Sequence, residues 1–515
     1  MRLSTFRQAL AATAATAATA VLAGCSSSTA VNSTSPTSSS TSSGGSSAST
    51  AAVTDATTVA DAVADNVEVE AGDTAYDESD VVDVSLQGST ATAESDAVST
   101  DAGTVTITTA GTYRLSGDLT GQVVVDSALD GVVRLVLDDA TITSDTTAAI
   151  DVVDAQSVVV VLADGTSNTL ADATTYDDTS EEAPTGALYS TADLTIGGTG
   201  SLTVTGNANN GIVGKDGLVI TGGTVEVTSP DDGIIGKDYL AITGGDVTVD
   251  AVDDGLKSDN STDAGSGFVL IEDGTVTVDS QGDAVKAVQI LIAGGTVEVV
   301  GSNEALEASV VIIDDGDVQL HAADDGINVA SADDSAATDG VGGPPAGGPG
   351  GAGMEVDDSL NLVINGGTVE VWSSGDGLDS NGHATITGGD ITVYGPTADG
   401  NGALDVNGTF EVTGGTLVAT GSSGMMVAPS ADSAQGWIAT ALPATAVAGS
   451  EVVITDDDGT ELATYTVEKD FASVVFSSAD VEQGTTYTVS VDGTDTDTTV
   501  TAGDAPAGGH GPMGG

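Results

Sequence analysis

Carboxylates recur at one fixed place in a repeating pattern, and this column is the feature of the sequence best suited to chemistry. When the repeating segments are aligned on the residue before a turn glycine or alanine, six of the eight aligned residues are acidic. Acidic residues number only 78 of 515 in the whole chain, so the position itself selects for them. The aligned residues are Asn210, Asp232, Asp254, Asp283, Glu304, Asp325, Asp376 and Gly402.

Such a column needs compensation for its charge. Two carboxylates one repeat apart repel each other by roughly 1 to 3.5 kcal/mol, and several repeats double the column with Asp231, Asp253 and Asp324. Hard cations that accept several oxygen ligands relieve this repulsion, and Ca²⁺ tolerates the irregular geometry of turns. The alternative is that Asp and Asn stand here because they suit the backbone beside glycine, with their carboxylates merely solvated.

Lysines lie close to the same column. Of the five lysines in the chain, four fall within five residues of it, namely Lys215, Lys237, Lys257 and Lys286. One interpretation is that they neutralise the acidic column. The other is that Lys237, Lys257 and Lys286, with Asp283, bind the carboxylates or hydroxyls of an extended sugar chain. At the offset of Lys257 and Lys286 the later repeats carry Glu307, Asn328, Asp379 and Asp405, so this face changes from cationic to acidic.

The elements that position these residues follow from an internal repeat. Leu218 and Leu240 begin two similar segments 22 residues apart, each with an apolar strand, a Gly-Gly turn, a second strand and an Asp-Asp-Gly turn. Self-similarity at this period indicates stacked coils. Alternation places Leu218, Ile220, Val225 and Val227 on one face. We predict an all-β fold, a parallel β-helix with a small C-terminal β cap; a β-propeller needs about 40 residues per blade and fits less well.

Further segments begin at Leu194, Phe268, Ile290 and Val310 and, after a break, at Leu360, Ala384 and Thr409. The composition agrees with a solenoid, because 69 glycines and only 3% aromatic residues do not suit the core of an ordinary large enzyme. A formal net charge of −69 argues against nucleic acid and anionic membrane surfaces as partners. We expect a monomer.

The N-terminus has the features of an export signal. Residues 1–25 combine Arg2 and Arg7 with an apolar, Ala-rich run, and Leu22-Ala23-Gly24-Cys25 resembles a bacterial lipobox. We predict lipidation of Cys25 and tethering to the outer face of the bacterial cell membrane, so that the lipid anchor is the only membrane contact. The alternative is an ordinary signal peptide with an incidental cysteine. Because Cys25 is the only cysteine, no disulfide forms within the chain.

Composition also divides the rest of the chain. Residues 26–80 are rich in Ser, Thr and Ala, which predicts a flexible spacer. The β-helix is expected over residues 81–430, with a Gly/Pro-rich loop at 331–359. Residues 431–500 read as an antiparallel unit that either caps the solenoid or forms a small independent binding module, and residues 501–515 as a disordered tail.

Several ordered motifs carry a resemblance to a known family. The run from Ala192 to Gly245, with LVLDDATITSDTTAAIDV and VVVVLADGTSNTLAD upstream, resembles the bacterial surface carbohydrate-binding family typified by a clostridial cellulose- and pectin-binding protein. The resemblance covers about residues 105–429. It implies a right-handed parallel β-helix similar to polysaccharide lyases, bound Ca²⁺, and binding of plant cell-wall polysaccharide, including cellulose and acidic, pectin-like glycans.

The resemblance also assigns residues. The three Asp-Asp-Gly turns match the family pattern, which implies that the calcium ligands are Asp231, Asp232, Asp253, Asp254, Asp324 and Asp325. The turns at Asn210, Asp283 and Glu304 depart from it. Few aromatic residues are available as sugar platforms, and the candidates are Tyr239, Trp372 and Tyr394.

Two other function classes remain open. A calcium-dependent polysaccharide lyase acting on uronates needs a Lys or Arg base beside the metal, and Lys257 and Lys286 beside Asp254 and Asp283 are the candidates. The lysines repeat along the axis, however, whereas catalysis concentrates at one place, so we expect a non-enzyme. The third class is a structural surface adhesin without a sugar ligand.

Overall fold

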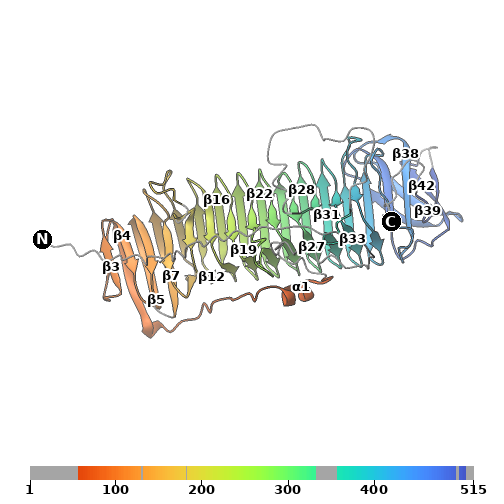
Figure 1. The fold of residues 1–515 in the computed structure, drawn as a ribbon. Coiled ribbons are helices and arrows are strands. Elements are labelled where there is room, and N and C mark those ends of the chain that lie inside the picture. The colour runs from red at the N-terminus through yellow and green to blue at the C-terminus, as the bar shows by residue number, and fades with distance from the viewer. Residues whose placement is uncertain (1–55, 129–130, 181–182, 332–355, 494–497, 506–515) are drawn as a thin grey trace, which may run out of the picture. The chain divides into compact units, whose positions relative to one another are not determined.

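Each strand of the repeat pairs in parallel with the equivalent strand of the next coil rather than with its neighbour in sequence. The computed structural model of the chain describes residues 56–128, 131–180, 183–331, 356–493 and 498–505. In these ranges the strands stack side by side in chain order (Figure 1). The predicted parallel β-helix is therefore confirmed.

One coil consists of three short strands. In the coil that begins at Gly217 they are β15 (Gly217–Ile220), β16 (Thr224–Ser229) and β17 (Ile234–Gly236). The first two are joined by the Gly-Gly turn and belong to a 26-stranded sheet, whereas the third belongs to a 13-stranded sheet. The Asp-Asp-Gly turn lies between the second and third strands, so every such turn faces the same side of the stack.

The other coils repeat this arrangement. The remaining first strands are β9 (Ser157–Leu162), β12 (Asp193–Gly198), β18 (Tyr239–Ile242), β21 (Phe268–Ile271), β24 (Gln289–Ile292), β27 (Val310–Ile313), β30 (Asn361–Ile364), β33 (His383–Ile386) and β36 (Phe410–Val412). The remaining second strands are β10 (Ser167–Ala171), β13 (Ser201–Thr205), β19 (Asp246–Ala251), β22 (Thr275–Ser280), β25 (Thr296–Gly301), β28 (Asp317–Ala322), β31 (Thr368–Ser373), β34 (Asp390–Tyr394) and β37 (Thr416–Gly421).

The third strands form the smaller sheet. Besides β17 they are β4 (Thr104–Ile107), β6 (Gln122–Asp126), β8 (Ile150–Asp154), β11 (Gly186–Ser190), β14 (Asn210–Gly214), β20 (Leu256–Ser258), β23 (Val285–Ala287), β26 (Leu306–Ala308), β29 (Ile327–Val329), β32 (Leu378–Ser380) and β35 (Leu404–Val406). At the start of the solenoid the long strands β1 (Val81–Gly88), β5 (Gly111–Thr120) and β7 (Val132–Thr143) replace the pair of short strands. Two short strands, β2 (Ala91–Ala93) and β3 (Val98–Asp101), form antiparallel hairpins with β1 and β4.

Aliphatic side chains form continuous ladders inside the coils. Leu218 pairs with Leu240, and Leu240 with Val269, and all three are buried in one cluster that runs through the solenoid. Ile220, Val225 and Val227 belong to the same cluster, as the alternation predicted. The expected segment starts at Phe268, Val310, Leu360 and Thr409 were one or two residues early, because the ladder positions are Val269, Val311, Leu362 and Phe410.

Glycine is required at the second position of the Gly-Gly turn. Gly245 has φ +92, a conformation that L side chains rarely adopt, and a Cβ there would lie 2.7 Å from the carbonyl oxygen of Gly223 in the preceding coil. The turn therefore lets successive coils approach each other closely, and it carries no functional group.

Residues 56–80 correct the predicted spacer over 26–80. They form α1 (Val59–Asp65) and a 3₁₀ turn (Glu78–Asp80), joined by an extended segment, and Val59 and Ala62 are buried against the outer face of the first strands. We call residues 56–80 the strap. The backbone N–H of Val59 donates to Asp314 (2.9 Å), that of Glu70 to the Tyr239 hydroxyl (3.0 Å) and that of Gly72 to Thr195 (2.8 Å). These three acceptors belong to successively earlier coils.

The strap runs along the solenoid from later coils to earlier ones and covers apolar side chains that would otherwise face water. These outward residues are Val219, Tyr239, Ala241, Phe268, Leu270, Leu291, Val310, Ile312 and Val363. The first strands are thus apolar on both faces, and the alternation argument accounted for only one of them.

The C-terminal unit is antiparallel, as predicted. Its strands are β38 (Trp437–Ala446), β39 (Glu451–Asp456), β40 (Glu461–Thr466), β41 (Phe471–Ser477), β42 (Thr486–Val491) and β43 (Thr498–Thr501). β41 pairs with both β37 of the last coil and β38, and the other four strands form a separate sheet. The unit therefore occupies the open edge of the last coil. No helix among the described residues is long and apolar enough to cross a membrane.

Candidate functional site

The acidic column is a ladder of side chain to backbone hydrogen bonds between coils. Asn210 accepts the backbone N–H of Asp232 through Oδ1 at 3.0 Å, Asp232 accepts that of Asp254 at 3.1 Å, and Asp254 accepts that of Asp283 at 3.0 Å. The ladder continues to Glu304, whose N–H donates to Asp283 at 3.3 Å. The column therefore favours short side chains with an oxygen acceptor because each one accepts a backbone N–H of the next coil.

Glu304 interrupts the ladder. Its longer side chain turns aside and accepts the Nδ2 group of Asn328 at 2.9 Å. The ladder resumes with Asp325, which accepts the N–H of Asp376 at 2.5 Å, and Asp376 in turn accepts that of Gly402 at 2.5 Å. Gly402 provides no acceptor, so the ladder ends at this residue.

Lys257 and Lys286 neutralise the first half of the column. Lys257 Nζ lies 2.8 Å from Asp254 and 3.3 Å from Asp232, and Lys286 Nζ lies 2.9 Å from Asp283 and 2.7 Å from Glu307. Burial opposes the charged form of each lysine, but the adjacent carboxylates outweigh it and raise the pKa of both. Both ammonium groups therefore stay charged and are engaged by carboxylates of their own chain.

The second half of the column has no lysine beside it. The three residues that pair in register after Glu307 are Asn328, Asp379 and Asp405. Carboxylate oxygens of Asp325, Asp376 and Asp379 lie within 4.8 Å of one another, and we call these three residues the cation-free cluster. Among the described residues, Asp379 forms no hydrogen bond or ion pair through its carboxylate.

The electrostatics of the cation-free cluster are unfavourable. Burial, and next the charge of Asp324, raise the pKa of Asp325 to about 7. Burial raises the pKa of Asp376 to about 6 and that of Asp379 well above its usual value. Beside the cluster, burial and the neighbouring Asp283 raise the pKa of Glu304 to about 8. Each of these shifts records a cost of ionisation that a cation would remove.

An uncompensated oxygen lies next to the cluster. Asn328 Oδ1 is buried and has no hydrogen-bond partner among the described residues, and Asn328 pairs directly with Asp379. Two oxygens on opposite sides of a Ca²⁺ ion stand about 5 Å apart, since each lies at 2.3 to 2.6 Å from the metal. Carboxylate oxygens within 4.8 Å, with an amide oxygen adjacent, are therefore a donor set that fits a hard cation.

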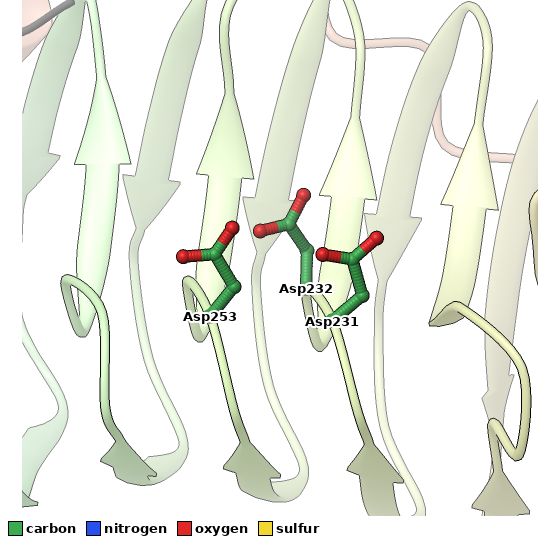
Figure 2. A group of neighbouring side chains, drawn as sticks. All are labelled: Asp231, Asp232 and Asp253. Carbon is green, nitrogen blue, oxygen red and sulfur yellow. The ribbon is translucent and has the colours of Figure 1, made fainter. Parts of the chain in front are cut away.

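A second group of carboxylates lies at the first two Asp-Asp-Gly turns. Asp231, Asp232 and Asp253, from adjacent coils, bring carboxylate oxygens within 4.8 Å of one another (Figure 2). Burial raises the pKa of Asp232 to about 6 although Lys257 lowers it. A cation here would share Asp232 with the lysine.

A third group, Asp283, Glu304 and Glu307, meets the same distance condition. Lys286 already contacts two of its three members. Burial, and next the interaction with Glu307, raise the pKa of Asp283 to about 6. The lysine occupies the place that a metal ion would need.

The structure places the sequence-predicted ligands in different settings. It brings together Asp231, Asp232 and Asp253 and puts Asp325 in the cation-free cluster. Both carboxylate oxygens of Asp254 are engaged, by the Asp283 N–H and by Lys257. Asp324 is exposed and lies outside the cluster.

Sequence reasoning did not assign Asp376 and Asp379 as ligands. The signal was present, since Asp376 stood in the aligned column and Asp379 at the offset where lysine gives way to acid. Of the predicted sugar-binding lysines, Lys237 pairs with Asp259 at 2.7 Å and is partly exposed. Tyr239 is buried under the strap, whereas Trp372 and Tyr394 stack on each other. Cys25, the expected lipidation site, lies outside the described residues.

Part of the chain is similar to known proteins. Residues 100–341 match the model of the family described as carbohydrate-binding domain-containing protein. This part of the chain is similar to that family. A carbohydrate-binding domain-containing protein of Acetivibrio thermocellus is 45% identical over 188 residues, which are 36% of this chain and 66% of that protein. The chain thus spans just under two thirds of the length of that relative.

A solved structure also resembles the chain. The polysaccharide lyase-like protein from C. thermocellum, determined as a gadolinium derivative, matches with 32% sequence identity and a TM-score of 0.43. The match covers 46% of this chain and 99% of the other chain.

Proposed function

We propose that this protein binds polysaccharide without catalysis, through a parallel β-helix that holds Ca²⁺ in its acidic column. Similarity to the carbohydrate-binding domain family supports the ligand class. The glycans that we propose are cellulose and acidic, pectin-like chains. The observation that carries the calcium proposal is the cation-free cluster, where Asp325, Asp376 and Asp379 converge with no ammonium group beside them.

In this proposal the first half of the column is balanced by lysine and the second half by metal. Asp325, Asp376 and Asp379 would hold one Ca²⁺, with Asn328 Oδ1 as an adjacent oxygen donor. Bound Ca²⁺ would neutralise these carboxylates and offer positive charge to the hydroxyls or carboxylates of a sugar chain. The group Asp231, Asp232 and Asp253 is the second proposed calcium site.

The lysines argue against the lyase alternative. β-Elimination needs a neutral amine that accepts a proton. The pKa values of Lys257 and Lys286 are raised by the carboxylates around them, so neither amine is available as a base near neutral pH. We therefore favour binding over catalysis at this face.

We also propose that the protein is a secreted lipoprotein anchored by Cys25 at the outer face of the bacterial membrane. The support is the sequence Leu22-Ala23-Gly24-Cys25. Mass spectrometry of the mature N-terminus from membrane fractions, with Cys25→Ser as control, tests this. An unmodified Cys25 in the mature protein would contradict it.

Retention on insoluble cellulose and pectin, measured with and without a calcium chelator, tests the function. We expect retention that the chelator weakens and that added Ca²⁺ restores. Retention on neither material would favour a structural adhesin. Unsaturated product formed from polygalacturonate, followed in the ultraviolet, would instead establish the lyase.

A further inference from the structure

An aromatic stack lies on the outer face of the second strands, a few residues before the acidic turns. His321 of β28 and Trp372 of β31 pair in register, and their ring centroids are 4.3 Å apart with an interplanar angle of 8°. Trp372 stacks in the same way on Tyr394 of β34 at 5.3 Å. Tyr394 is buried whereas His321 is exposed, so the stack presents the imidazole at its open end.

A groove of about 440 Å³ opens beside His321 and Trp372. Small residues from successive coils line it, among them Gly301, Ser302, Ala323 and Ser374. A Cβ on Gly301 would have only Asp279 Oδ1 within 4 Å, at 3.5 Å, so no side chain of the coil fills this space. Asp279 also lines the groove.

The remaining wall comes from the C-terminal unit. Lys469, between β40 and β41, lines the groove and donates to the carbonyl oxygen of Ser373, while the neighbouring Glu468 accepts the indole N–H of Trp372 at 3.2 Å. Within the described residues Lys469 forms no ion pair. Its ammonium group thus lacks the carboxylate partners that Lys257 and Lys286 have. Burial also lowers its pKa, which is the cost of holding this charge away from water.

The combination matches one class of ligand. Aromatic rings offer an apolar face with a defined geometry to the C–H face of a pyranose. An ammonium group in a partly desolvated place binds a carboxylate through a charge-assisted hydrogen bond. We propose that this groove binds one uronic acid residue of an acidic polysaccharide, with the sugar ring against His321 and its carboxylate on Lys469.

This inference rests on the proposed polysaccharide binding and names a subsite for it. The subsite requires no metal and is built from two parts of the chain, the coils and the C-terminal unit. It therefore gives the C-terminal unit a role in binding besides its position at the end of the solenoid.

The test is calorimetric titration of the full chain, with calcium present, using oligogalacturonate as the uronate probe and a cello-oligosaccharide as the neutral one. Lys469→Met should weaken oligogalacturonate binding about tenfold and leave cello-oligosaccharide binding unchanged. Lys215→Met, which removes the same charge from an exposed site, should leave both unchanged. His321→Ala should weaken oligogalacturonate binding about threefold to tenfold, and His321→Phe should retain it. Unchanged thermal melts establish that each variant is folded.

Two results would overturn the subsite without overturning the proposed function. One is equal weakening by Lys469→Met and Lys215→Met, because the effect would then be long-range charge alone. The other is that no groove variant alters oligogalacturonate binding although the wild-type chain is retained on insoluble polysaccharide. In that case the proposed function stands and the subsite fails. A wild-type chain retained on no polysaccharide overturns both.

Discussion

Asp254 Oδ1 accepts the backbone N–H of Asp283 at 3.0 Å, so a side chain of one coil holds the main chain of the next. The other oxygen of Asp254 contacts Lys257 at 2.8 Å. Asp254→Ala should destabilise the protein by about 1 to 3 kcal/mol because it leaves a buried N–H without an acceptor. Asp254→Asn keeps an Oδ1 acceptor and should cost less.

Both substitutions remove the same negative charge and leave Asp232 as a partner for Lys257. The difference between them therefore isolates the hydrogen bond. Denaturant unfolding of the two variants measures it. Equal losses of stability would mean that charge, and not the acceptor, explains the column.

Calcium should stabilise the folded chain through the cation-free cluster. A single site at a free Ca²⁺ concentration about 100-fold above its Kd adds about 2.7 kcal/mol. Asp379→Asn should lose much of this gain. In chelator the same variant should be more stable than wild type, because it removes a repelling charge next to Asp325 and Asp376.

Thermal melts with calcium and with chelator measure both effects. Asp390→Asn, which removes an exposed carboxylate at the start of β34, is the matched control and should behave as wild type in each condition. An unchanged melting temperature on adding calcium to wild type would mean that the carboxylates are only solvated.

Asp151 on β8 should make stability depend on pH. Burial raises its pKa from 3.8 to about 6, so between these values the folded chain holds a proton that the unfolded chain releases. The contribution of Asp151 to the free energy of unfolding is therefore fully present below about pH 4 and declines as the pH rises to about 6. Asp151→Asn removes the decline and should stabilise the protein by up to about 3 kcal/mol at pH 8, with little change at pH 4.

Asp154→Asn is the control, since Asp154 is exposed at the end of the same strand. Denaturant unfolding at the two pH values gives the comparison. The interpretation would fail if Asp151→Asn stabilised the protein equally at both.

The strap should protect the outer face of the first strands. Val59→Asp places a charge where Val59 is only 4% exposed and should weaken docking of the strap by about 2 kcal/mol or more. Hydrogen exchange should then speed up in α1 and in the extended segment after it. Ala60→Asp lies on the exposed side of the same helix and should leave exchange unchanged. Exchange equal in the two variants would argue against a docked strap.

The sequence by itself determined the coil, because a fixed period places equivalent residues in register whatever else the chain does. The pairing of Lys257 with Lys286, and then with Glu307, Asn328 and Asp379, could be read from an alignment alone. So could the aliphatic ladder through Leu218 and Leu240, since side chains alternate along a strand.

Only the tertiary structure decided where each oxygen points and what covers each face. The same Asp-Asp-Gly sequence gives a hydrogen-bonded, lysine-paired carboxylate at Asp254 and a member of an unneutralised cluster at Asp325. The Ser/Thr/Ala-rich composition predicted a flexible spacer that includes residues 56–80. It carries no information about the apolar outer face of the first strands, some 200 residues later in the chain, against which Val59 and Ala62 pack. Lys469 likewise reaches the carbonyl oxygen of Ser373 only because β41 folds back onto the last coil. A repeat specifies contacts along its own axis, whereas contacts between segments outside the repeat depend on packing that no local pattern encodes.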